Sequence, residues 1–133
     1  MCLLLFTTPS YEAIAAEKEN SHFNEEVIDI HVTMYYHLLA QKFSPYQVKV
    51  WDEIKQEQNI LKKKIEELHK AGALLHGDKV EHTWIERHQQ LQRALTKAVK
   101  EYDEEALKEI LPKIFEHQRE LNEKMKEKIK MAK

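Results

Sequence analysis

Residues that interrupt helices are scarce in this chain, whose 133 residues include only two glycines and three prolines. Glu, Lys, Gln, Leu and Ala, which all favour helix, are abundant instead. A sheet-rich protein needs frequent turns, and turns depend mainly on Gly, Pro, Asn and Asp. The scarcity of glycine and proline therefore predicts an all-α protein.

The few turn and capping residues divide the chain into four predicted helices. Ser44-Pro45 is typical of an N-cap followed by proline at the first helical position. Gly72 and Gly77 bracket the end of the second helix, after which Asp78 can cap the third. Asp103, followed by two glutamates, can cap the fourth. Apolar residues at three- and four-residue steps then predict helices over 23–42, 45–71, 80–102 and 104–129.

Short connections between consecutive amphipathic helices favour antiparallel neighbours, so we expect an up-down-up-down four-helix bundle. The first helix is either long or preceded by a short helix over residues 10–20. Helical spacing from Ala13 through Phe23 to Met34 favours one long helix. We expect residues 1–133 to form a single domain, with the apolar segment 1–9 packed on its body or on a second copy.

Charge and composition exclude several classes of function. The formal net charge is −2 with both signs mixed along the chain, so no overall field attracts nucleic acid or a membrane surface. No apolar run approaches the roughly 18 residues of a membrane span. MCLLLF lacks a basic leader and is shorter than the core of a signal peptide. Cys2 is the only cysteine, which fits a reducing compartment, and we expect a cytoplasmic protein.

Histidines in the first and third helices are expected to point inward. The first helix gathers Glu25, Asp29 and Thr33 on one face, and the opposite direction passes through His31. In the stretch EHTWIERHQQLQ (81–92), His88 lies within the apolar stripe of the third helix, whereas His82 lies outside it.

The second and fourth helices carry polar residues at similar heights. Residues 58 and 118 are glutamines within apolar stripes, and counting from the turns places them within about two helical turns of the two histidines. We therefore predict a buried polar layer of His31, Gln58, His88 and Gln118, with His117 beside it. Such a layer must be satisfied internally, by water or by a ligand.

Two explanations of this layer stay open. The first is a hydrogen-bonded layer that fixes helix register, as isolated polar core residues do in coiled coils. The second is a transition-metal site, because imidazoles suit zinc, iron or copper and neighbouring helices bring them close together. The expected ligands are then His31, His88, His117 and Glu120.

The run VIDIHVTMYYHLL (27–39) distantly resembles the first metal-binding helix of hemerythrin-like proteins. The resemblance implies a four-helix bundle with a di-iron site, in which His31 is the ligand from the first helix. That family also uses a His-x-x-x-Glu helix and a His-x-x-x-His helix. This chain has His82-x-x-x-Glu86 on a face expected to be exposed, and it has no His-x-x-x-His.

No motif for nucleophilic catalysis or phosphate binding occurs, and the carboxylates are spaced as on solvent-exposed helix faces. The sequence therefore predicts no enzyme and no obligatory cofactor. We expect a non-catalytic binding or regulatory module that contacts a protein partner or a second copy. The alternative is a metal-binding bundle that holds zinc or iron.

Overall fold

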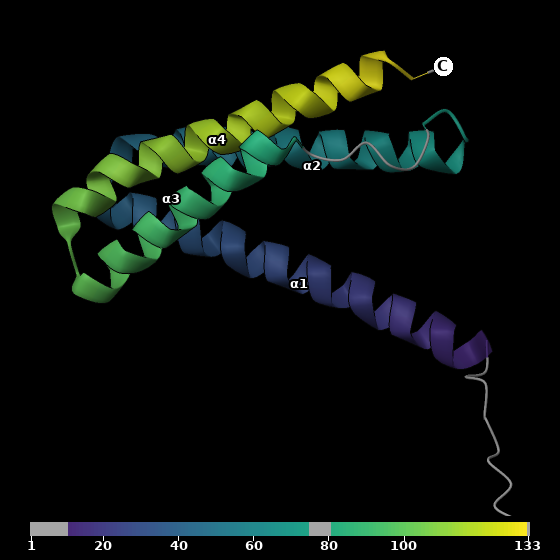
Figure 1. The fold of residues 1–133 in the computed structure, drawn as a ribbon, viewed down its shortest axis with the longest axis horizontal. Helices are drawn as coiled ribbons and strands as arrows, with labels where there is room; N and C mark the ends of the chain where they lie inside the picture. Colours follow the sequence, from purple (N-terminus) through teal and green to yellow (C-terminus); the bar gives the residue numbers. More distant parts are fainter. Residues whose placement is uncertain (1–10, 75–80, 133) are drawn as a thin grey trace, which may run out of the picture. The chain divides into compact units, whose positions relative to one another are not determined.

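The computed structural model describes residues 11–74 and 81–132 (Figure 1). In these residues the chain forms four α-helices, one short 3-10 helix and no strand. The all-α prediction is confirmed for this part of the chain. The elements are α1 (Tyr11–Phe43), η1 (Pro45–Gln47), α2 (Val48–Lys70), α3 (His82–Glu101) and α4 (Glu104–Lys130).

The first two helices meet at Ser44, close to the predicted boundary. Helix α1 is continuous from Tyr11, so the short separate helix is not formed. Pro45 begins the single turn η1, and α2 starts three residues later, at Val48, than the sequence predicted. Ser44 occupies the N-cap position, but its side chain makes no capping hydrogen bond.

The connection between α3 and α4 is formed as the sequence predicted. Tyr102 ends α3 in the left-handed region, with φ of 52°. Asp103 then caps α4, and its Oδ1 accepts a hydrogen bond of 3.1 Å from the backbone N–H of Ala106. Gly72, with φ of 71°, follows the end of α2. The expected cap at Asp78, Gly77 and the apolar segment 1–9 lie outside the described residues.

The chain divides into two compact units, Met1–Tyr35 and Tyr36–Lys133. The expected single domain therefore stays a prediction, and each unit is described by itself. No helix in the described ranges combines the length and the apolar character needed to cross a bilayer.

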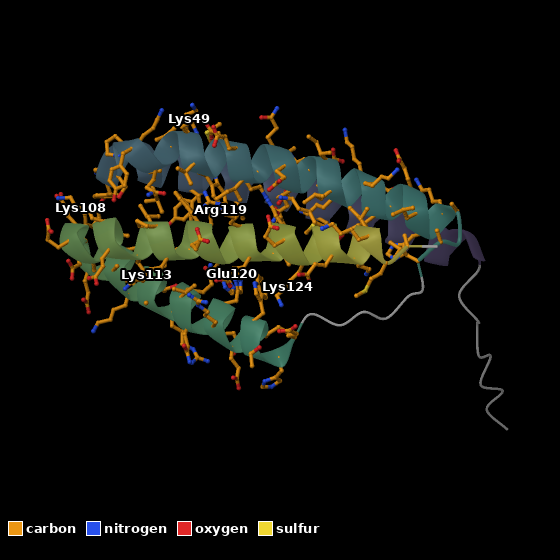
Figure 2. The ribbon with its side chains drawn as sticks, turned by 90° about the horizontal axis from the view of Figure 1, so that it is seen from above. Lys49, Lys108, Lys113, Arg119, Glu120 and Lys124 are labelled. Atoms are coloured by element: carbon orange, nitrogen blue, oxygen red, sulfur yellow. The ribbon has the colours of Figure 1, made fainter. Side chains whose placement is uncertain are left out.

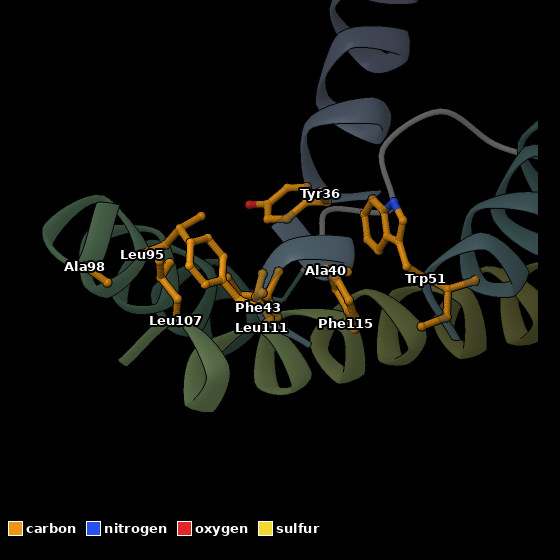
Figure 3. Packing of buried hydrophobic residues seen from close by; sticks show 11 residues of the cluster. Tyr36, Ala40, Phe43, Trp51, Leu95, Ala98, Leu107, Leu111 and Phe115 are labelled. Carbon is orange, nitrogen blue, oxygen red and sulfur yellow. The ribbon is translucent and has the colours of Figure 1, made fainter. Parts of the chain in front are cut away.

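In the C-terminal unit, α4 packs against both α2 and α3 and lies between them (Figure 2). The centre of this unit is aromatic. The rings of Trp51 and Phe115 stack with centroids 4.7 Å apart, and Tyr36 meets the edge of Phe115 at 6.1 Å (Figure 3). Apolar residues from all the helices complete the core, including Ala40, Leu95, Leu107 and Leu111. Burial of this apolar surface is the main stabilising contribution to the unit.

Candidate functional site

Three flat side chains stack between α3 and α4. Trp84 and His88 lie one turn apart on α3, with ring centroids 5.1 Å apart and planes inclined by 10°. His117 of α4 lies against Trp84 at 4.2 Å and 15°, and its centroid is 5.6 Å from that of His88. The His-Trp-His group therefore joins α3 to α4 through ring contacts.

His117 is the most deeply buried member of this stack, with an exposed fraction of 1%. Neither of its ring nitrogens has a hydrogen-bond partner, although a neutral imidazole carries one donor and one acceptor. The nearest carboxylate oxygen belongs to Glu120, 3.8 Å from Nδ1, and Glu120 also accepts from Arg87 at 3.1 Å. His117 is thus a buried polar group without a satisfied nitrogen, which costs stability.

The surroundings favour the neutral form of both imidazoles. Burial lowers the pKa of His88. Burial also lowers the pKa of His117, where the neighbouring His88 and Arg87 act in the same direction and Glu120 opposes them. The stack is therefore uncharged near neutral pH, and a proton on either ring places a charge in a site that does not solvate it.

A second polar group lies between α2 and α4. Buried Gln58 donates a hydrogen bond of 3.2 Å to Oε1 of Gln118, and its own Oε1 accepts one of 2.7 Å from Nζ of Lys55. One turn further along α4, buried Asn122 donates to the carbonyl oxygen of Ile54 at 2.9 Å and to Glu57 at 3.1 Å. These bonds link α2 to α4 at defined heights along the two helices.

The predicted layer is only partly assembled. Gln58 and Gln118 are in contact, and His88 packs beside His117, each pair across a different face of α4. His31, which we expected to be buried, is exposed on the N-terminal unit. The reason is that the apolar face of α1 that contains His31 is itself exposed.

The proposed metal ligands do not form a site in the part of the chain that the structure describes. No group of three or more His, Cys, Asp and Glu side chains there is arranged to hold a metal ion. His88, His117 and Glu120 lie near one another, but Glu120 pairs with Arg87 and the two imidazoles stack. His82 is exposed and pairs with Glu86 at 3.3 Å.

Helix α1 carries a second candidate site on its surface. Five large apolar side chains are exposed along two of its turns, at fractions from 41% for Val32 to 61% for Ile30. We call them the apolar stretch of α1, and its members are Ile28, Ile30, Val32, Met34 and Tyr35. The half-buried positions among residues 24–35 are Val27, Asp29 and Thr33, so two of those three are polar.

Sequence reasoning missed the buried polar residues Lys55 and Asn122. It also missed that both histidines stack on the ring of Trp84. A spacing signal was present for the first two: Lys55 precedes Gln58 by three residues and Asn122 follows Gln118 by four, so each pair shares a helix face. Lysine is seldom buried, so residue type alone does not indicate Lys55 as a core position.

The two buried groups join α4 to α2 through hydrogen bonds and to α3 through ring contacts. No family model matches the chain, and comparisons with curated proteins and with solved structures found no match.

Proposed function

We propose that this protein is a non-catalytic binding module that recruits a protein partner through the apolar stretch of α1. The observation that carries the proposal is the exposure of five large apolar side chains within residues 28–35 of α1. Together they expose on the order of 500 Å², toward the upper end of the largest apolar patch on a typical monomer. Large exposed apolar patches usually mark interaction sites.

The charge pattern supports the same conclusion. Charged residues make up 33% of the chain, yet no Asp, Glu, Lys or Arg occurs from Ile30 to Gln41. A helix face that stays in water normally carries charged side chains. The interiors of protein interfaces, by contrast, are depleted in charge and enriched in Tyr and Met. Met34 and Tyr35 at the centre of the stretch fit that composition.

Metal binding by the bundle has less support as a function. Of its four expected ligands, His31 is exposed, while His88 and His117 are held in a stack with Trp84. The binding-module proposal needs no metal and no cofactor, and it treats both buried polar groups as structural.

Two finer features belong to the same proposal. We infer that the four helices run antiparallel in up-down-up-down order. The support is the length of two connections: four residues, including η1, separate α1 from α2, and two residues separate α3 from α4. We also place the protein in the cytoplasm, supported by its lone cysteine, and expect no binding to nucleic acid at a net charge of −2.

Site-specific photocrosslinking in cells that express the protein tests the binding proposal. A photoreactive phenylalanine at Met34 is expected to give a discrete adduct that mass spectrometry identifies as protein. The matched control is Ile60 on α2, which is equally apolar and 64% exposed but lies outside the stretch. A probe at Met34 that yields no adduct, or the same adducts as Ile60, counts against a specific binding surface on α1.

A further inference from the structure

The exposed side of α1 is the side that its sequence makes most apolar. At 100° per residue, Met34 and His31 lie between Ile30 and Tyr35 on the helix circumference, and the polar side chains of Asp29 and Thr33 lie opposite. The half-buried positions include Asp29 and Thr33, while Ile30 and Met34 are 61% and 54% exposed. This helix therefore presents to solvent the face that ordinarily packs against another helix.

We propose that a second copy of this chain covers the apolar stretch of α1, with the two α1 helices antiparallel about a twofold axis. The inference rests on the proposed function, and it names the partner. Val27, His31 and Met34 follow one another at four- and three-residue steps, which is the spacing of a helix-pairing seam. About a twofold axis, the same face of α1 in each copy forms both sides of the interface.

The stretch is complementary to itself when it is reversed. An axis between residues 32 and 33 places His31 of one copy opposite Met34 of the second copy. Ile28 then lies within about 3 Å, along the helix axis, of Tyr35 of the second copy, so that each smaller side chain meets a larger one. Both pairs occur twice by symmetry. The five side chains of both copies expose about 1,000 Å² together, which is the most that pairing can bury from them and equals the lower bound for a specific interface.

Thiol crosslinking of the full chain tests both the partner and the direction. In a Cys2→Ser background, single variants Val27→Cys, Met34→Cys and the control Ile60→Cys are treated with a short bismaleimide. At 1.5 Å per residue, the antiparallel pair separates the two copies of residue 34 by about 5 Å along the axis and those of residue 27 by about 16 Å. We expect a covalent dimer from Met34→Cys, and little from Val27→Cys or Ile60→Cys.

Each other outcome overturns a defined part of the inference. Dimers from both Val27→Cys and Met34→Cys show a parallel pair. Dimers from Ile60→Cys at the yield of Met34→Cys show unspecific collision. Absence of dimer from all three variants, with helicity by circular dichroism unchanged, excludes the second copy as the partner. In that last case a photocrosslinked adduct at Met34 with a different protein preserves the proposed function, whereas no adduct removes both.

Discussion

Replacing His117 by leucine tests the description of the buried stack through stability. The wild-type imidazole lies 4.2 Å from the ring of Trp84 and has two buried nitrogens without hydrogen-bond partners. Leucine has a similar volume and no polar atom, so the swap removes the unsatisfied groups with little change in packing volume. It also removes the ring contacts with Trp84 and His88.

The magnitude at neutral pH follows from these two opposing effects. An unsatisfied buried polar group costs about 1–3 kcal/mol. Loss of an aromatic ring pair costs about 0.5–1.5 kcal/mol. Leucine also favours helix over histidine by a few tenths of a kcal/mol. We therefore expect His117→Leu to raise the free energy of unfolding by about 1 kcal/mol at pH 7.5.

The same variant should also flatten the dependence of stability on pH. The pKa of His117 is lowered below its ordinary value of 6.5, first by burial. Below pH 6.5 the unfolded chain therefore binds a proton that the folded chain does not bind, and the folded state loses stability as pH falls. For one imidazole this loss between pH 7.5 and 5.5 cannot exceed about 1.4 kcal/mol. His117→Leu removes this contribution, while that of His88 remains.

Urea unfolding followed by circular dichroism at pH 7.5 and 5.5 measures both effects. His82→Leu is the matched control, because His82 lies on α3 with its side chain 85% exposed and should change stability by less than about 0.5 kcal/mol. If the His117→Leu protein is less stable than the wild type at pH 7.5, the claim that the unpaired nitrogens of His117 cost stability is wrong. If the variant and the wild type lose the same free energy of unfolding between pH 7.5 and pH 5.5, the pH dependence does not come from His117.

Three further outcomes follow from the other contacts. Asp103→Ala removes the cap of α4 and should cost about 0.5–2 kcal/mol in urea unfolding; an unchanged midpoint shows that the cap is unimportant. Gln58→Leu removes the hydrogen bonds of Gln58 to Lys55 and Gln118 and should lower the free energy of unfolding by about 1–3 kcal/mol. Adding Gln118→Leu should recover part of that loss. Strictly additive losses argue against the hydrogen bond between Gln58 and Gln118. Elemental analysis of protein purified without a histidine tag should find less than one equivalent of zinc, iron and copper, and one bound equivalent revives the metal site.

The helices and several of their ends followed from the sequence because local signals determine them. Asp103 formed the predicted cap, and α2 began three residues after the predicted proline because Pro45 starts a 3-10 turn instead. Residue counts from the turns also placed Gln58 and Gln118 at one height, where they are hydrogen-bonded. Counting works here because both residues lie within continuous helices that pack against each other.

The prediction that His31 is buried was wrong. Sequence patterns contain no information about the cause. The periodicity of α1 identified its apolar face, and that face does include His31, Met34 and Ile30. Periodicity does not say which molecule covers the face, and His31 is exposed in the chain by itself. Stacking of His88 and His117 on Trp84 was equally hidden, because it depends on how the rings of two helices are oriented.

Sedimentation velocity over a concentration series tests most directly the claim that the apolar stretch of α1 is a contact surface between copies. The variant Ile30→Glu/Met34→Glu changes two exposed residues of the stretch, and Ile60→Glu makes the same change on α2. We predict that the wild type and Ile60→Glu form dimers as concentration rises and that the double variant stays monomeric with unchanged helicity. A wild type that stays monomeric throughout, or a double variant that still dimerises, contradicts the account.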